Sequence, residues 1–424
     1  MIGFYIKGLL RDRHRSLFPV LIVLIGVMIT TTLHCYMTGM FGQFIADAAR
    51  FDTGHVKVTT RAYADFAGEF PNDLAIDNAD SVTTVLRERY PELLWEQRIK
   101  FGGLLDFSDS LGNPISQGPV MGIATDLMGR NDQDIDFLNL NKALRSGRLP
   151  EKPGEALAAA RLLEEFNQEI GAEALLVTGS ATGGMAIFKF EIVGTIEFGI
   201  PMLDRNLIVV DLQDARWGLD MMGWSGEILG YQPKLVYDDK KALTIKNDFN
   251  SAFEDTTNEY STTMNILSDN PQLGVSLKIA KIFVLILIMI FVFAMSIVLW
   301  NTGLLQGIRR YGEFGVRLAM GESKTRVYLG MVYESIVIGI IGSVIGTAIG
   351  LGISYYLQEV GIDMTKAMRQ VDMVVSGVLH AKITPLSFFI GFVPGLMATI
   401  FGAVFSGLGI FKRQTAQLFK ELEE

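Results

Sequence analysis

The sequence contains little of the chemistry that most enzymes need. It has a single cysteine, Cys35, which lies within an apolar run and excludes an internal disulfide. Four histidines are scattered over different regions of the chain: His14, His34, His55 and His380. This scatter argues against a metal cluster and against a Ser/His/Asp constellation. We therefore expect no catalytic residue and no metal site in this chain.

Signals for binding nucleotides and nucleic acids are also missing. No segment reads G-x-x-x-x-G-K-[ST], the pattern whose backbone amides and lysine cradle nucleotide phosphates. The glycine-rich segment at 179–185 lacks the lysine, and we interpret it as a tight turn. The formal net charge of -9 argues against a nucleic-acid partner, because binding a phosphate backbone requires a basic surface. We expect this chain itself to bind no cofactor.

Apolar residues make up 49% of the chain, a fraction that soluble proteins also come close to. The clustering of these residues along the chain therefore decides whether it is a soluble or a membrane protein. They concentrate in four blocks, each long enough to cross roughly 30 Å of hydrocarbon. The blocks are residues 17–52, whose last part forms a stalk beyond the membrane, 277–306, 327–357 and 385–411. The sequence therefore predicts a membrane protein with four transmembrane α-helices.

The region between the first two blocks, residues 53–276, has the pattern of a large folded α+β domain. Alternation of apolar and polar residues predicts strands, among them 53–60, 93–107, 115–125 and 188–198. Helical periodicity predicts helices at 81–90, 155–170 and 240–253. This domain is expected to be inserted between the first and second membrane helices.

Basic residues indicate which ends of the blocks face the cytoplasm. They gather in the amphipathic N-terminal segment 1–16, in segment 307–326 and in the tail 412–424. Because positively charged segments stay inside, these three segments are predicted to be cytoplasmic. The α+β domain and the loop 358–384 are then extracytoplasmic.

The segment 309–326 combines charged and apolar residues between two membrane blocks. It is too polar to span a bilayer, so we expect it to lie as a helix at the membrane surface. Glu313 and Arg317 share a face of that helix, but an exposed pair contributes only about 0.3–0.5 kcal/mol. Stability alone therefore does not account for them, and docking to another chain is the sharper hypothesis. Gly321 is expected to end the helix.

The third membrane block carries small residues at helical spacing. Glycines at one face of a membrane helix let two backbones approach closely, and we assign four to helix packing: Gly339, Gly342, Gly346 and Gly350. Glu334 lies in the same block, where a carboxylate is costly unless it faces protein or water. Two hypotheses for Glu334 are equally supported, a contact that couples the chain to a partner and a hydrogen bond that fixes helix packing.

The segment and the helix after it resemble the signature of the FtsX/MacB/LolC–LolE permeases, the membrane subunits of ABC systems. The residues that match are Arg309, Arg310, Glu313, Phe314, Gly315, Ala319, Gly321, Ser323 and Glu334. TGHVKV after the first block and PGEALAAARLLEEFNQEIGAEALLV are closest to the LolC/LolE branch. In that branch two small α+β subdomains form the outer domain, one interrupting the other, which here implies an interruption at about 126–226.

This resemblance implies a permease subunit of the bacterial inner membrane, with ATP and Mg bound by a separate ATPase subunit. It further implies a second permease subunit, identical or related, a lipoprotein or other lipidic substrate, and an optional periplasmic carrier. Mechanotransmission from the ATPase would pass through seven coupling residues: Arg309, Arg310, Glu313, Phe314, Arg317, Leu318 and Gly321. Four stalk residues could line a substrate cavity between two subunits: Phe41, Phe44, Ile45 and Phe51. Packing of the two subunits against each other is the equal alternative for them.

Three other readings stay open at this point. A MacB-like exporter subunit is possible, although proteins of that kind usually carry the ATPase on the same chain. An FtsX-like regulator of a cell-wall hydrolase typically has a much smaller outer domain than residues 41–276. A membrane receptor would not explain the segment at 309–326.

The predicted topology can be tested by labelling single cysteines from outside the cell, after Cys35 has been replaced. Gly112→Cys, in a predicted outer hairpin, should be modified by an impermeant maleimide. Ser323→Cys, in the predicted cytoplasmic segment, should not be modified until the membrane is opened. Strong labelling of position 323 from outside would contradict the topology.

Overall fold

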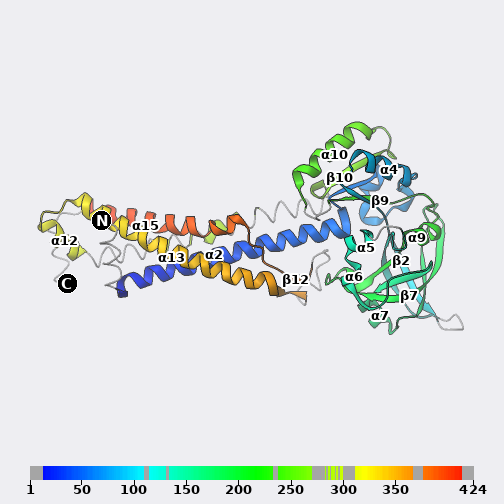
Figure 1. The fold of residues 1–424 in the computed structure, drawn as a ribbon, viewed down its shortest axis with the longest axis horizontal. Helices are drawn as coiled ribbons and strands as arrows, with labels where there is room; N and C mark the ends of the chain where they lie inside the picture. Colours follow the sequence, from blue (N-terminus) through cyan, green and yellow to red (C-terminus); the bar gives the residue numbers. More distant parts are fainter. Residues whose placement is uncertain are drawn as a thin grey trace. The chain divides into compact units, whose positions relative to one another are not determined.

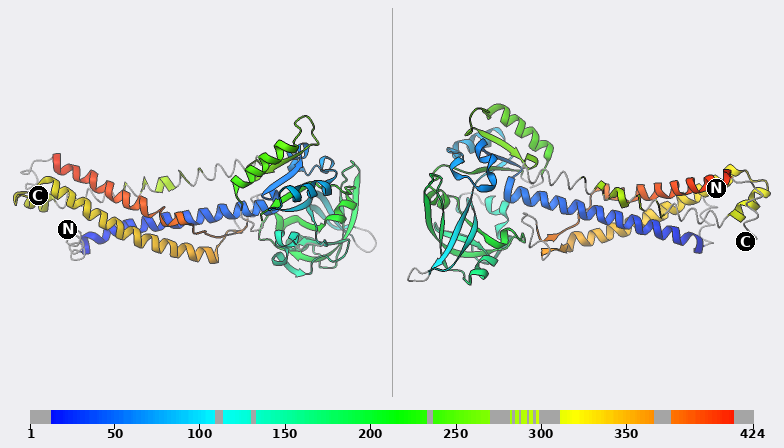
Figure 2. Two further views of the ribbon diagram at one scale, coloured as in Figure 1. Left: turned by 45° about the horizontal axis from the view of Figure 1, so that its top comes forward. Right: turned by 180° about the vertical axis from the view of Figure 1, so that it is seen from behind.

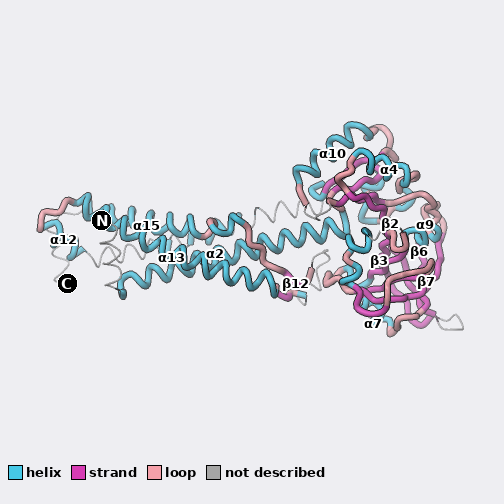
Figure 3. Tube along the Cα trace, viewed as in Figure 1, coloured by secondary structure: helices cyan, strands magenta, loops and turns pink. Residues whose placement is uncertain are grey.

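The computed structural model describes residues 13–108, 114–129, 133–232, 237–269, 311–365 and 376–412, with scattered positions between 282 and 298. The chain divides into two compact units. We call Met1–Gly42, Lys278–Ile362 and Leu379–Glu424 the helical unit, and Gln43–Leu277 with Asp363–Val378 the sheet unit. Nearly all strands belong to the sheet unit (Figure 3).

The helical unit is built on three long helices, α2 (Arg13–Ala48), α13 (Lys324–Val360) and α15 (Phe392–Lys412), which run side by side (Figures 1 and 2). The short helix α12 (Tyr311–Ala319) precedes α13, and a 3-10 turn, η5 (Pro385–Phe388), precedes α15. Among the described residues, three stretches are long and apolar enough to cross a membrane: Leu17–Thr53, Lys324–Val360 and Pro385–Phe405.

These three stretches coincide with the first, third and fourth helices predicted from the sequence. The predicted second helix, 277–306, falls outside the described residues except for scattered positions between 282 and 298, which are helical. The predicted segments 1–16 and 412–424 fall almost wholly outside the described residues. Three apolar helices are therefore established, and the fourth stays a prediction.

Two of the helices are much longer than a bilayer requires. Helix α2 has 36 residues and α13 has 37. At 1.5 Å per residue each is roughly 55 Å long, whereas the hydrocarbon core measures roughly 30 Å. Each helix is therefore long enough to carry a displacement further than the thickness of the hydrocarbon core, although α2 lacks one backbone hydrogen bond at Pro19, near its start.

The sheet unit contains a small antiparallel sheet, which we call the base sheet, with strand order β10-β1-β9-β2. Its strands are β1 (Val56–Thr60), β9 (Glu227–Tyr231), β10 (Thr262–Ile266) and the first half of β2 (Leu94–Ser108). Side chains alternate between its faces. Val56, Val58 and Ile228 form a core with helices α4 (Ala79–Arg89) and α10 (Asp239–Phe253) on one face. Lys57 and Glu227 therefore point to the other face.

The second half of β2 enters a closed six-stranded barrel. Each strand pairs with the next in the order β2-β3-β8-β5-β7-β6, and β6 pairs back to β2. The strands are β3 (Pro114–Thr125), β5 (Glu155–Ala159), β6 (Glu173–Gly179), β7 (Met185–Ile196) and β8 (Leu207–Asp211). Its interior holds the larger core of the unit, with Leu105, Phe107, Val120, Leu176 and Phe190. Strand β2 thus belongs to both subdomains.

The remaining described elements are short connections around the two subdomains and the outer loop. They are η1 (Ala49–Thr53), α3 (Arg61–Asp65), η2 (Ala67–Glu69), η3 (Asn72–Leu74), α5 (Gln133–Leu138), α6 (Leu140–Ala143), β4 (Leu144–Gly147), α7 (Ala160–Phe166), α8 (Leu203–Asn206), α9 (Leu212–Gly218), η4 (Leu267–Asp269), β11 (Ile362–Asp363) and β12 (Val378–Leu379). The expected α+β composition of residues 53–276 is therefore seen in the described part.

One predicted helix is partly wrong. Residues 155–170 were expected to be helical, but Glu155–Ala159 is strand β5, and only Ala160–Phe166 is helix α7. Strand β5 pairs with β7 and β8 and is fully buried. Pairing in the barrel thus overrides the helical preference of an alanine-rich segment. The barrel also begins within β2, before the predicted start of the interruption at 126, and it ends before β9 at Glu227.

Candidate functional sites: packing face, corner and buried joint

Helix α13 packs against α2 through glycines. Three glycines four residues apart face α2: Gly342, Gly346 and Gly350. A methyl group added to Gly346 would lie 2.6 Å from the carbonyl oxygen of Leu24 and 3.0 Å from Cβ of Val27. The fourth assigned glycine, Gly339, faces Thr399 and Leu396 of α15 instead. One helix thus uses two glycine faces to hold two neighbours at close approach.

Replacing one of these glycines should separate the helices. Gly346→Leu puts a side chain where the α2 backbone lies, so we expect loss of the assembled protein or a marked fall in its melting temperature in detergent. Gly352→Leu is the matched control, because a methyl group there meets no atom within 4 Å. If both variants assemble and melt like the parent, the close packing is not needed for the fold.

The corner between α12 and α13 is fixed by backbone hydrogen bonds. Gly321 has a φ of 93°, which favours glycine, and it follows the last turn of α12. The Glu322 N–H donates to the Arg317 carbonyl at 3.0 Å, and the Gly321 N–H donates to the Leu318 carbonyl at 3.1 Å. This pair of bonds is the Schellman motif. Ser323 then occupies the N-cap position of α13, although its side chain makes no capping hydrogen bond.

The corner exposes an apolar stripe. Val316 is 48% exposed and Met320 76%, and Ala319 between them is also exposed. Residues at this spacing lie on one face of α12. Leu318 and Arg317, which the sequence suggested as contacts, are only partly exposed.

The other predicted coupling residues are described less fully. Arg309 and Arg310 fall outside the described residues, and for Glu313 and Phe314 only the helical backbone is described. Glu334 is partly buried on α13, ten residues after the helix begins at Lys324. Its two readings, coupling contact and packing contact, stay open.

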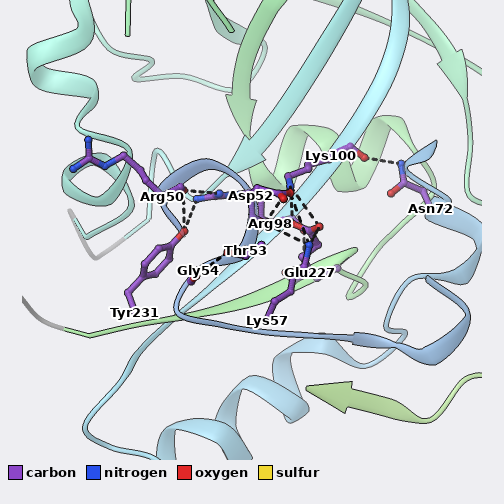
Figure 4. A network of polar contacts seen from close by, with 11 residues as sticks. Arg50, Asp52, Thr53, Gly54, Lys57, Asn72, Arg98, Lys100, Glu227 and Tyr231 are labelled. Carbon is purple, nitrogen blue, oxygen red and sulfur yellow. Dashed lines mark hydrogen bonds and ion pairs between the residues drawn. The ribbon is translucent and has the colours of Figure 1, made fainter. Parts of the chain in front are cut away.

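The polar face of the base sheet receives the end of α2. After Ala48 the chain makes one π-helical turn, η1, and the last carbonyl groups of a helix need donors from outside it. The Arg98 Nη1 and Tyr231 Oη atoms each donate to the Arg50 carbonyl at 3.1 Å. The Lys100 Nζ donates to the Asp52 carbonyl at 3.3 Å (Figure 4). Cations therefore cap the negative end of the helix dipole, which is the favourable arrangement.

Two carboxylates complete this buried joint. Lys57 Nζ lies 3.0 Å from Glu227 Oε1, and Lys100 Nζ lies 2.8 Å from Asp52 Oδ1 and 3.2 Å from Glu227 Oε2. Glu227 is 1% exposed and Lys100 is 5% exposed. Burial disfavours the charge of Lys100, but Asp52 and Glu227 outweigh this effect and raise the pKa of Lys100 above its ordinary value. The end of α2 is thus fixed to β1, β2 and β9 by paired charges.

Removing one carboxylate should leave uncompensated charge in the interior. Glu227→Ala leaves Lys57 and Lys100 with Asp52 as their remaining carboxylate partner, and we expect a loss of about 3–5 kcal/mol in the unfolding free energy. Thermal and denaturant unfolding of the detergent-solubilised chain measures this loss. Glu173→Ala is the control, since Glu173 pairs with Lys189 at the surface, where the pair is 66% and 56% exposed, and it should behave like the parent. Equal stability of the two variants would contradict the structural role of the joint.

The residues predicted to line a substrate cavity divide into two pairs. Phe44 packs with Ala48 and Leu267, and Phe51 meets Phe198 edge to face at 4.9 Å. Phe44 is only 7% exposed and Phe51 only 4%, so both side chains are buried within this chain. Both anchor the end of the stalk in the sheet unit, and the predicted cavity between two subunits stays a prediction. Phe41 and Ile45 are partly exposed.

The buried joint was not predicted from the sequence. Its residues come from four places in the chain: Asp52, Lys57, Arg98 with Lys100, and Glu227. The available signal was a charged residue at an alternate position of an apolar strand, such as Lys57 between Val56 and Val58. That pattern also fits a strand with one solvated face, so burial could not be read from it.

Comparison with known proteins gives a family match for part of the chain. Residues 283–415 match a family model described as FtsX-like permease C-terminal, which is less than half of the chain. A comparison with curated proteins gives no match. Among solved structures, the chain is similar to the crystal structure of the periplasmic region of MacB from Actinobacillus actinomycetemcomitans. The identity is 10% over 53% of this chain and 94% of that one, with a TM-score of 0.34.

Proposed function

We propose that this chain is the permease subunit of an ABC transporter that releases lipoproteins from the bacterial inner membrane. The match of residues 283–415 to the FtsX-like permease family supports the permease part. The three apolar helices support a place in the membrane. ATP and Mg would be bound by an ATPase on a separate chain, and a second permease subunit would complete the transporter.

The observation that carries the proposal is the corner between α12 and α13. It lies within the residues that match the family, it is fixed by the Schellman motif at Gly321, and it exposes Val316 and Met320. Apolar side chains on a short charged helix are suited to a groove on a partner protein. A rigid corner passes a push on α12 directly to α13, because no flexible linker absorbs it.

The rest of the chain offers a continuous path for that push. Helix α13 contacts α2 through its glycine face, where the backbones are too close to slide independently. Helix α2 runs unbroken to Ala48, and the buried joint fixes the turn that follows it to the base sheet. In the proposed cycle, closure of the ATPase on ATP selects one of two arrangements of these helices.

The lipoprotein cargo is the second part of the proposal. It rests on the resemblance of TGHVKV and of the segment from Pro153 to Val177 to the LolC/LolE branch. A periplasmic carrier that accepts the cargo is part of the same proposal. The anchoring of Phe44 and Phe51 inside the sheet unit leaves Phe41 and Ile45 as the stalk side chains that could meet a lipid chain.

The proposed contact with the ATPase can be tested at the exposed stripe. Met320→Asp places a charge in an apolar interface, so we expect the co-purified ATPase to fall at least roughly tenfold, with cargo-stimulated ATP hydrolysis lost as well. Thr325→Asp is the control, because it adds the same charge at an exposed position five residues further on. Parental levels of ATPase binding and hydrolysis in Met320→Asp would show that the corner is not the coupling element.

A further inference from the structure

A short segment before η5 lies along α2 and meets it at regular intervals. We call residues 376–382 the strap. In the helical unit, the Lys382 N–H donates to the Cys35 carbonyl at 2.9 Å. One turn further along α2, Gly39 lies so close to the strap that an added methyl group would overlap the backbone of 380–382. The strap therefore sits on the α2 backbone itself at this point.

Within the sheet unit, the other end of the strap is bound by side chains of α2. The Gln43 Nε2 atom donates to the Val378 carbonyl at 2.9 Å, and the Ser376 N–H donates to Asp47 Oδ2 at 3.1 Å. Asp47 is 8% exposed, so this acceptor lies in the interior. The Gly377 N–H donates to the Gly199 carbonyl of the loop between β7 and α8 at 2.6 Å.

The spacing of these contacts is systematic. The four α2 residues that hold the strap are each four apart: Cys35, Gly39, Gln43 and Asp47. Residues at this spacing share one helix face. They span about 18 Å along α2, a length that seven residues in extended conformation can cover. The strap runs in the opposite direction, because its later residues meet the earlier residues of α2.

We propose that the strap is a second tether, which fastens the connection between α13 and α15 to α2 and so makes the sheet unit respond to all three helices. The first tether is the covalent continuation of α2 into the sheet unit. The strap contains β12 and leads through η5 into α15, and the Ala381 N–H donates to the Leu357 carbonyl of α13 at 3.3 Å. A shift of α15 or α13 therefore pulls on the bonds to Gln43 and Asp47. This inference rests on the proposed function, because a tether matters only where motion is transmitted.

Two glycines on α2 give a matched pair of variants. Gly39→Ala must lift the strap from the helix, since its methyl group meets backbone atoms that cannot rotate away. Gly42→Ala makes the same change in helix propensity, but its methyl group meets only the flexible end of Lys382, at 4.0 Å. Asp47→Ala is a second and milder variant, which removes the acceptor of Ser376 and leaves the backbone packing at Gly39 intact.

The strap is monitored by hydrogen exchange of the peptide 376–382, measured on the permease–ATPase complex in lipid nanodiscs. We expect exchange to rise roughly tenfold in Gly39→Ala, to rise near Ser376 in Asp47→Ala, and to stay at the parental level in Gly42→Ala. Unchanged exchange in both Gly39→Ala and Asp47→Ala would show that the strap is not seated as described.

The tether is tested by ATP-dependent release of a triacylated lipoprotein from proteoliposomes. We expect Gly39→Ala to hydrolyse ATP like the parent but to release the lipoprotein at least roughly tenfold more slowly, with Gly42→Ala unaffected. The tether is contradicted if Gly39→Ala shows fast hydrogen exchange of the strap but releases the lipoprotein at the normal rate. It is also contradicted if both glycine variants lose release equally. If the parental complex itself releases no lipoprotein, the proposed cargo is wrong. In that case the tether is tested by the hydrogen exchange of the sheet unit. Changes on adding ATP that are present in the parent and lost only in Gly39→Ala support the tether.

Discussion

The carbonyl groups at the end of α2 impose the constraint from which the sheet unit is organised. A helix of 36 residues that ends inside a folded domain must find donors for its last carbonyls there. Arg98, Lys100 and Tyr231 supply them, and they can do so only because the base sheet turns one face towards the stalk. The opposite face carries the apolar side chains that pack on α4 and α10. Because side chains alternate along the strands, one face of the base sheet forms the core and the other face caps the helix end.

The same helix organises the helical unit. Its first half meets the glycines of α13, Val27 meets Gly395 of α15, and Thr31 meets Gly391, just before α15 begins. Its second half carries the strap and ends in the joint. These contacts are close backbone approaches and partly or fully buried polar bonds, so several of them must change together when one element moves. A few collective arrangements are expected of such a bundle, which suits a permease that alternates between two states.

The elements that were predictable from the sequence are those with a local signal. Apolar runs of bilayer length gave the positions of α2, α13 and α15, and Gly321 followed by Ser323 marked the corner. The long hairpin of β2 and β3 was predicted because alternation persists over both strands. Neither the burial of Phe44 and Phe51 nor the strand at Glu155–Ala159 has a local signal, since both depend on partners far away in the chain.

The joint and the strap could not be predicted from the sequence, for the same physical reason. Lys57, Lys100 and Glu227 meet only after β1, β2 and β9 have paired, and 170 positions separate Lys57 from Glu227. Gln43 and Asp47 contact residues more than 300 positions away. A sequence shows that such polar residues exist, but only the register of the strands and the course of the strap show which of them are buried together.

The account depends most on the claim that α12 and the corner after it dock into an ATPase. The direct measurement is photo-crosslinking in native membranes, with a photoreactive amino acid at position 320 and, separately, at position 325. We predict that position 320 captures a chain identified by its own G-x-x-x-x-G-K-[ST] peptide, and that ATP changes the yield. A chain that is intact in the membrane but captures no ATPase from position 320, with or without ATP, would contradict the account.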